Sequence, residues 1–396
     1  MDDSTNNLMN GSDTGSSADS TPTKHAPFSP RYTVQVTDAV KDGDAIQFTV
    51  MSSKCDTEKG FVVTRVYEDI EWLHHCVLTQ NETDGVIVPP PPNRPEMDPR
   101  SAENKSKKQL GNDTKILKGD EFHKDCRAME KYLQLMLQHE VFGGDANLEK
   151  FLTEKEPPVR VKVKKGLFGK LSSAVDGARK GGHRDIDEYF HNKREWATKW
   201  SQAIKESSIN FNKIVCAQYR VSSSYTHLAT ALIWTGANKD DATVKINKVF
   251  MKLSDALNDS KHGLEVLCTN DEKTMGLQLD LYARYSDSIK EMLLRRTCLL
   301  VEYEDANKAL DKAKPLKRQA AEEAKQTAEK SYEVCSDNAR REMKTFLQQR
   351  ILSTQESLVA FAESQIRTAR DTYTLLVRTL SSIKQMEQLD PVSRPA

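Results

Sequence analysis

The spacing of apolar residues divides the chain into two unlike parts. In residues 29–88, three short runs alternate apolar and polar residues, beginning near Tyr32, Ile46 and Phe61. This alternation is typical of strands with one buried face, and the short connections predict an antiparallel meander. Further along, apolar residues recur at helical spacing at about 68–78, at about 122–142 and around Phe151. We therefore expect an α+β domain of three strands and several helices.

The second half of the chain is almost free of helix breakers. Between Asp185 and Asp390 there is one internal proline, Pro315, and the only glycines are Gly236, Gly263 and Gly276. Proline and glycine are the residues that interrupt helices most strongly. The sequence therefore predicts an all-α region of three long helices, at about 184–235, 240–313 and 316–386.

The third of these helices carries a narrow apolar stripe at alternating intervals of four and three residues. That spacing is typical of a coiled-coil seam, and one chain of this shape shields such a seam poorly. We expect the helices to pack antiparallel and to dimerise along the stripe. The expected dimer seam consists of Leu347, Ile351, Leu358, Tyr373, Leu376 and Leu380.

Three further segments have distinctive compositions. Residues 1–28 are polar and are expected to form a disordered tail, and about 96–126 reads as a polar, lysine-rich insert. Residues 156–183 combine many cations with apolar residues at helical spacing, which is the pattern of a helix lying in a membrane interface. A helix packed on the long helices is the alternative. The expected membrane residues are Lys164, Lys165, Leu167, Phe168, Lys170, Leu171, Val175, Arg179 and Lys180.

Composition narrows the classes of function. The 396 residues are 37% hydrophobic and 29% charged, and the net charge is zero, which argues against a general nucleic-acid binder. Seven scattered cysteines without a CxxC pair indicate reduced thiols and no metal site. No nucleotide-binding loop or nucleophile motif is present, and the dispersed histidines read as surface residues, so we expect neither an enzyme nor a cofactor. Without an apolar run long enough to span a bilayer, any membrane contact is expected to be peripheral.

Two stretches resemble known families. The run from Arg65 to Leu73, the prolines at 89–92 and the helix around Tyr132 resemble phox-homology (PX) domains, over about 29–155. The run from Tyr303 to Ala313 resembles the end of the second BAR helix in sorting nexins, nearest to the five and six subgroup. The resemblance implies a BAR domain at 184–388, and hence a PX domain followed by an elongated three-helix coiled coil.

The PX resemblance implies a phosphoinositide pocket, because guanidinium groups bind phosphate oxygens in pairs. The matching residues are Arg65, Tyr67, Arg94 and Arg127. Val66 and Asp125 stand where the family usually carries cations, so the pocket is expected to be degenerate for 3-phosphoinositides. The subgroup also implies a groove beside the sheet for cargo peptides. The insert here is shorter than the subgroup's helical hairpin.

The resemblance implies a peripheral, membrane-remodelling sorting nexin in endosomal cargo sorting and retromer-type retrograde transport. Its expected location is the cytoplasm and the cytoplasmic face of early endosomes and tubules. Expected partners are anionic lipids, transmembrane cargo tails, and a sorting nexin of the one and two subgroup or a second copy. A coiled-coil scaffold that does not bind membranes is the alternative. The expected basic tip consists of Lys308, Lys312, Lys314, Lys317 and Arg318.

Overall fold

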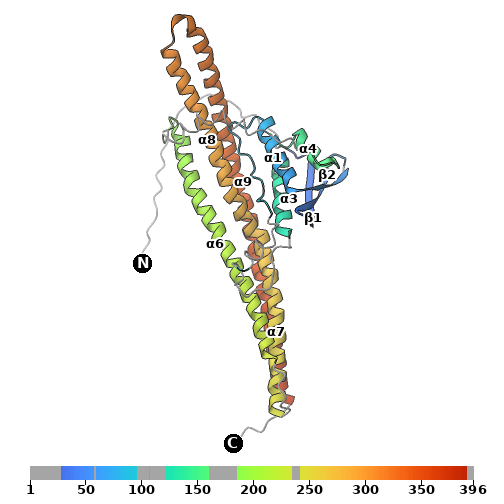
Figure 1. Ribbon diagram of the computed structural model, residues 1–396. Helices are drawn as coiled ribbons and strands as arrows, with labels where there is room; N and C mark the ends of the chain where they lie inside the picture. The colour runs from blue at the N-terminus through green and yellow to red at the C-terminus, as the bar shows by residue number, and fades with distance from the viewer. Residues whose placement is uncertain are drawn as a thin grey trace, which may run out of the picture.

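A small α+β module lies beside a long helical stalk (Figure 1). The computed structural model describes residues 28–57, 59–95, 107, 122–159, 185–233 and 241–389. The expected disordered tail therefore lies outside the described residues, except for Phe28. Most of the expected insert and most of the basic linker lie outside them as well.

The module contains one antiparallel sheet with the strand order β1-β2-β3. The strands are β1 (Tyr32–Asp42), β2 (Ala45–Lys54) and β3 (Gly60–Arg65). The tight β1–β2 turn uses Gly43 at φ 59°, a left-handed conformation that glycine adopts without strain. The predicted meander is confirmed.

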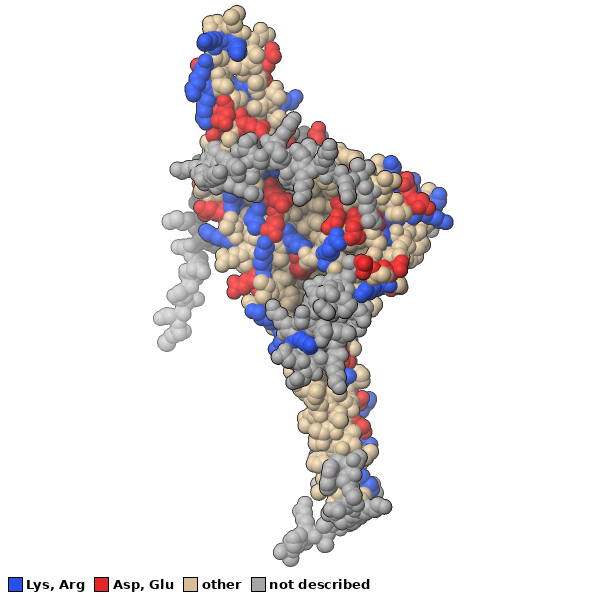
Figure 2. Space-filling view, viewed as in Figure 1, with Lys and Arg blue, Asp and Glu red and all other residues tan. Residues whose placement is uncertain are grey.

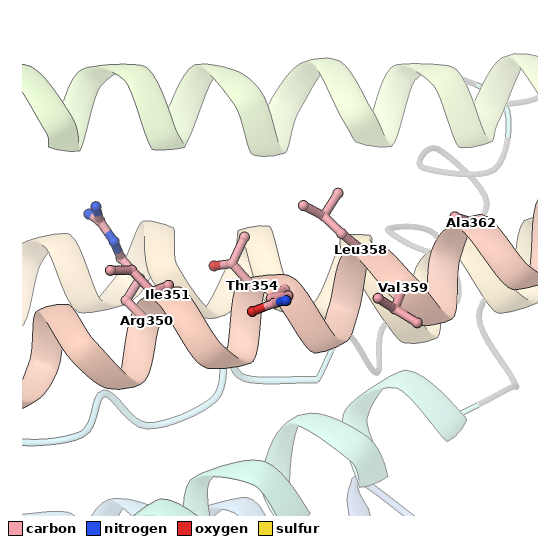
Figure 3. Close-up of a pocket in the computed structure, with 7 residues that line it drawn as sticks. Arg350, Ile351, Thr354, Leu358, Val359 and Ala362 are labelled. Atoms are coloured by element: carbon pink, nitrogen blue, oxygen red, sulfur yellow. The ribbon is translucent and has the colours of Figure 1, made fainter.

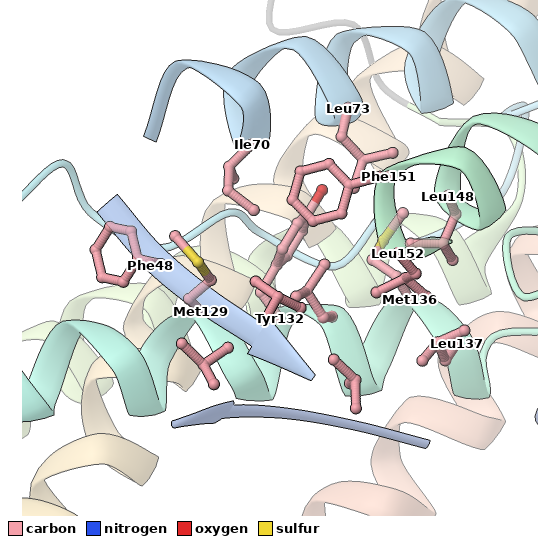
Figure 4. Close-up of a cluster of buried hydrophobic side chains, with 14 of the residues drawn as sticks. Phe48, Ile70, Leu73, Met129, Tyr132, Met136, Leu137, Leu148, Phe151 and Leu152 are labelled. Carbon is pink, nitrogen blue, oxygen red and sulfur yellow. The ribbon is translucent and has the colours of Figure 1, made fainter. Parts of the chain in front are cut away.

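Three helices cover this sheet and enclose the core of the module: α1 (Tyr67–Gln80), α3 (His123–Gln138) and α4 (Ala146–Thr153). Phe48 from the sheet, Leu73 from α1, Tyr132 from α3 and Phe151 from α4 are completely buried and meet in one cluster (Figure 4). Asp145 caps α4 by accepting hydrogen bonds from two backbone amides of its first turn. Each predicted helix of the module is present.

His74 is not the surface residue expected from the sequence. Its Nδ1 lies 3.2 Å from the hydroxyl of the buried Tyr132, and burial lowers the pKa of its imidazole to about 4. In the unfolded chain the same group titrates near 6.5. Between about pH 4 and pH 6.5, His74 is therefore mostly protonated in the unfolded chain and mostly neutral in the folded chain. Stability contributed by neutral His74 is therefore lost as the pH falls from about 6.5 towards 4.

We expect the thermal midpoint of the protein to fall between pH 7 and pH 5, and to fall less in a His74→Gln variant. The glutamine amide keeps a polar contact with Tyr132 but does not titrate. His123→Gln is the control, because His123 is exposed. Thermal melts followed by circular dichroism at both pH values measure the effect. Equal pH slopes in the native and His74→Gln proteins would contradict it.

The stalk consists of three antiparallel helical rods. The first is α6 (Glu188–Leu232). The second contains α7 (Asp241–Asp271), a π-helical turn (Glu272–Gly276) and α8 (Leu277–Asp311). The third is α9 (Arg318–Leu389), whose 72 residues span roughly 108 Å. The hairpin of α8 and α9 extends beyond α6 at one end (Figure 1).

Small residues let α6 lie close to the second rod. Five buried positions on α6 recur at intervals of seven, which matches the period of a coiled coil. They are Ser201, Ser208, Val215, Ser222 and Ala229. The hydroxyls of Ser201 and Ser286 lie 2.9 Å apart, so this polar member of the stripe is paired across the two rods.

A buried ion pair ties the start of the stalk to its second rod. The guanidinium of Arg296 on α8 lies 2.5 Å from the carboxylate of Asp185, and both side chains are fully buried. Arg296 also donates to Ser336 and Tyr332 of α9 and lies 3.5 Å from the ring centre of Phe190. One side chain thus joins all three rods.

The loop after α1 attaches the module to the stalk. At Gly85 (φ 77°) a Cβ atom would lie 2.3 Å from the carbonyl oxygen of Cys335, so the loop backbone rests directly on α9. Ile87 is buried within the core of the stalk. Four side chains of the stalk form hydrogen bonds with the backbone of this loop: Arg284, Arg295, Asn338 and Glu342. We call residues 83–92 the docking loop.

Candidate functional site: tip, pocket and exposed seam

The α8–α9 turn forms a basic tip. A short 3₁₀ turn, Pro315–Lys317, joins the two helices, and the side chain of Leu316 within it is fully exposed. The cations predicted for this tip are Lys308, Lys312, Lys314, Lys317 and Arg318. In Figure 2 positively charged side chains cover one side of the projecting hairpin, with acidic side chains below them.

Most of these cations are free to meet an outside anion. Lys308 lies 3.0 Å from Asp305, an exposed pair of the kind that contributes little to stability. Within the described part of the chain, the other four form no ion pair. Leu316 was missed in the sequence, although a leucine between a proline and two cations at a helix turn was a usable signal. An exposed apolar side chain among cations suits an anionic lipid surface.

The structure brings together two of the four residues expected in the phosphoinositide pocket. The Arg94 guanidinium lies 4.9 Å from the ring centre of Tyr67, whose hydroxyl donates to the carbonyl of Pro92. Arg94 also pairs with Glu68 at 2.7 Å and Glu71 at 2.8 Å. A phosphate would have to displace two carboxylates from this arginine.

The other two residues lie elsewhere. Arg65 is buried, and its three nitrogens donate to the backbone carbonyls of Phe151, Thr64 and Glu154. It joins β3 to α4, and its burial keeps it away from a headgroup at the surface. Arg127 is exposed on α3, 3.6 Å from Glu130. It lines a polar hollow beside β1 together with Lys273 of the π-helical turn.

The β1 edge of the sheet, where a peptide strand could add, is occupied by side chains of α3. Glu130 accepts a hydrogen bond from the Val36 amide at 3.0 Å, and Gln134 donates to the Val34 carbonyl at 3.4 Å. Strand addition requires free backbone groups at a sheet edge. A peptide added to β1 would therefore have to replace these two side chains.

The expected dimer seam is largely exposed on the single chain. Tyr373 is 72% exposed and Ile351 is 64% exposed, while Leu347 is partly buried against the core of the stalk. Leu358, Leu376 and Leu380 are each about half exposed. We call the end of the stalk that lies away from the basic tip the lower stalk. On the face shown in Figure 2, its charged side chains lie mostly along one edge. Apart from Leu347, the seam residues are thus not part of a core within one chain.

The exposed apolar surface extends to the neighbouring helices. On α6, Ile214, Val221 and Leu228 are exposed at intervals of seven, one position before the buried stripe. On α7, Ile246 and Met251 are also more than half exposed. An apolar surface of this length is rare on a protein that stays monomeric, and it indicates an interaction site.

The expected membrane helix of the basic linker falls outside the described residues, from Lys164 to Lys180. Among the described residues, no cluster of His, Cys, Asp and Glu could hold a metal ion. Every helix in the described ranges is too polar or too short to cross a bilayer.

Two family models and several known proteins match this chain. The family model for the BAR domain matches residues 179–385, more than half of the chain, and the PX domain model matches 53–155. Human sorting nexin-6 is 28% identical over 374 residues, which cover 88% of this chain and 90% of the relative. Human sorting nexin-32 is 26% identical, covering 89% and 93%. A solved chain, from the cryo-EM structure of the SNX-BAR Mvp1 tetramer, is 13% identical with a TM-score of 0.49; the match covers 88% of this chain and 99% of that chain.

Proposed function

The chain belongs to the sorting nexins that combine a PX domain with a BAR domain, and from this premise we propose that it remodels endosomal membranes as a BAR dimer. Sorting nexins of this type are peripheral, membrane-associated adaptors in trafficking, and their PX and BAR domains imply lipid binding and dimerisation. The finer proposal is retromer-type retrieval of transmembrane cargo from early endosomes, with a sorting nexin of the one and two subgroup as partner.

The exposed apolar seam is the observation that carries this proposal. Burying it requires a second elongated chain, and two such chains joined along their lower stalks place a basic tip at each end. A pair of separated cationic tips on a rigid body responds to membrane shape, because both tips reach the lipid only when the surface matches their spacing. Each cation near an anionic leaflet contributes about 1 kcal/mol.

The PX domain is a secondary lipid contact in this proposal. Arg94 is neutralised by Glu68 and Glu71, and Arg65 is committed to the fold. Most of the lipid attraction is therefore assigned to the tips and to the basic linker at 156–183. Reading a cargo peptide by strand addition at β1 would need Glu130 and Gln134 to swing away.

Reversing the tip charge should weaken membrane binding without affecting assembly. We expect a Lys312→Glu, Lys314→Glu, Lys317→Glu variant to bind liposomes with 30% phosphatidylserine at least about 30-fold more weakly at low salt, since three attractive cations become repulsive. Liposome cosedimentation measures binding and sedimentation velocity measures dimer mass. Lys199→Glu, at an exposed site on α6, is the control.

Unchanged liposome binding by the tip variant would contradict the tip assignment. A native protein that dimerises but binds no anionic liposome would instead support the alternative of a coiled-coil scaffold. A native protein that stays monomeric with every candidate sorting nexin would contradict the BAR dimer itself.

A further inference from the structure

Leu316 has the most exposed large apolar side chain in the described part of the protein. It lies at the free end of the α8–α9 hairpin, which projects beyond α6 (Figure 1). Between 311 and 320 every residue except Ala313 is exposed, and Leu316 is the one large apolar residue among them. Its side chain therefore adds nothing to the core of the chain and is available for a contact outside it.

The backbone of the turn holds Leu316 in a defined position. The Lys317 amide donates to the Lys314 carbonyl at 2.8 Å, and the Arg318 amide donates to the Pro315 carbonyl. The ring of Pro315 also fixes the φ angle of the residue before Leu316. A side chain on an ordered backbone loses less conformational freedom on binding than one on a flexible loop, so the turn is prepared for a contact at Leu316.

The charge around Leu316 favours an anionic surface. Four of the five cations of the basic tip lie within four residues of Leu316, and residues 312–321 contain no acid. The first turn of α9 also lacks the acidic residue that often neutralises the positive end of a helix. The end of the hairpin is therefore positive without local compensation, and an apolar side chain stands in the middle of the cations.

The shape of the hairpin end favours a bilayer over a folded protein as its partner. One leucine on a narrow, convex end buries far less area than the roughly 800 Å² per partner of a standard protein–protein interface. A bilayer needs no matching pocket, because an apolar side chain can enter between the lipid headgroups. The stems of the neighbouring cations can then lie along the acyl chains while their charged ends meet the phosphates.

The dimer seam does not account for Leu316. Figure 3 shows Ile351 and Leu358 projecting from the middle of α9. Ile351 follows Leu316 by 35 residues, which is roughly 50 Å of helix. A second chain that covers the seam therefore contacts a different part of α9, and the hairpin end needs a partner of its own.

We propose that Leu316 is a membrane-insertion residue, which enters the acyl region of an anionic bilayer while the cations beside it bind the headgroup phosphates. The inference rests on the proposed lipid binding of the tip and adds an apolar contact to the attraction of charges. Salt screens the attraction of the exposed cations, whereas burial of a leucine is not screened. Insertion is easier where curvature separates the headgroups, so the tip binds curved membranes better than flat ones.

The variant Leu316→Ser removes the apolar side chain and keeps every charge of the tip. Because the side chain is fully exposed, we expect the variant to fold like the native protein. Its binding to small vesicles of phosphatidylcholine and phosphatidylserine, measured by cosedimentation, should be at least about tenfold weaker. The loss should be smaller on large, flatter vesicles, and the dependence of binding on salt should keep its slope, since the cations are unchanged.

Val334→Ser is the matched control for the loss of an exposed apolar side chain. Val334 lies on the same helix and is 49% exposed, but it is roughly 27 Å of helix away from Leu316. We expect this variant to bind vesicles like the native protein.

The depth of the side chain is tested with Leu316→Trp and vesicles whose phosphatidylcholine carries bromine on its acyl chains. Bromine quenches indole fluorescence at close range. The variant should therefore lose more emission on binding than the native protein, whose four tryptophans set the background.

Equal binding of vesicles by Leu316→Ser and the native protein would overturn the inference, and the proposed function would stand if reversal of the tip charge still weakens binding. The inference also fails if Leu316→Trp shows no additional quenching, because the side chain then stays among the headgroups or contacts another chain. A native protein that binds no anionic vesicle would overturn the lipid binding of the proposed function together with the inference.

Discussion

Replacing Asp185 by alanine is expected to destabilise the stalk by about 3–5 kcal/mol, the largest single effect on stability that we anticipate. The substitution leaves the buried guanidinium of Arg296 with only the carboxylate of Asp187, 3.9 Å away, and a poorly compensated buried charge costs several kcal/mol. It also removes an acceptor for the Asp187 amide at the entry to α6. Urea unfolding followed by circular dichroism at 222 nm reports the loss.

The double variant Asp185→Ala, Arg296→Met should recover part of this stability, because it removes the charge that was stranded. Asp305→Ala is the matched control, since Asp305 pairs with Lys308 at an exposed site and should leave the unfolding midpoint unchanged within error. A loss below about 1 kcal/mol in Asp185→Ala would show that the pair is not a main tie between the rods.

Replacing Gly85 by alanine is expected to release the PX domain from the stalk. The new Cβ would lie 2.3 Å from the Cys335 carbonyl oxygen and 2.8 Å from the Ala339 nitrogen, both of which are fixed backbone atoms of α9. The docking loop cannot tolerate this approach and must move away. We expect amide exchange at Ile87, whose amide donates to Glu342, to become at least about tenfold faster.

Gly43→Ala provides a close control for this experiment. Gly43 also has a positive φ of 59°, but a Cβ there has nothing within 4 Å. It therefore shares the backbone strain of Gly85→Ala without the collision. Hydrogen exchange and small-angle scattering of both variants separate the two causes. If Gly85→Ala scatters like the native protein and Ile87 stays equally protected, the loop does not hold the domains together.

Local patterns predicted most of the fold. Alternation around Val34 and Val50 specified strands, and the absence of glycine and proline specified long helices, because both signals act within a few residues. The π-helical turn at Glu272–Gly276 was not predicted, since its residues are ordinary helix formers apart from Gly276. The turn contacts both α6 and α9, which are distant from it in the sequence.

The seam shows the limit of such patterns. The 4-3 spacing of Tyr373, Leu376 and Leu380 correctly indicated a continuous apolar stripe, but spacing does not say which neighbour covers it. On the opposite side, α9 packs within the chain partly through Ser364, which is buried, and through the partly buried Thr372. Small polar residues can line a close helix contact, so apolar content alone does not identify the inner face of α9.

The candidate binding residues divide in the same way. The basic tip could be read from the sequence because its cations are neighbours along the chain. Arg65 matched a family pattern, yet its charge gave no sign that it would turn inward to three carbonyls. Nothing in the sequence near Arg350 predicts its surroundings. The fold places its guanidinium over the indoles of Trp196 and Trp200, which lie about 150 residues earlier in the chain.

If the PX domain and the basic tip both bind lipid, as the proposed function assumes, the docking loop determines how the two contacts combine. A flexible tether would let the PX domain search for its own headgroup, with an effective concentration set by linker length. Here Gly85 and Ile87 fix the domain on the stalk, so the angle between the PX surface and the tip is constant. The avidity of the pair then depends on geometry: it is high on a membrane that touches both surfaces together, and vanishes on one that cannot.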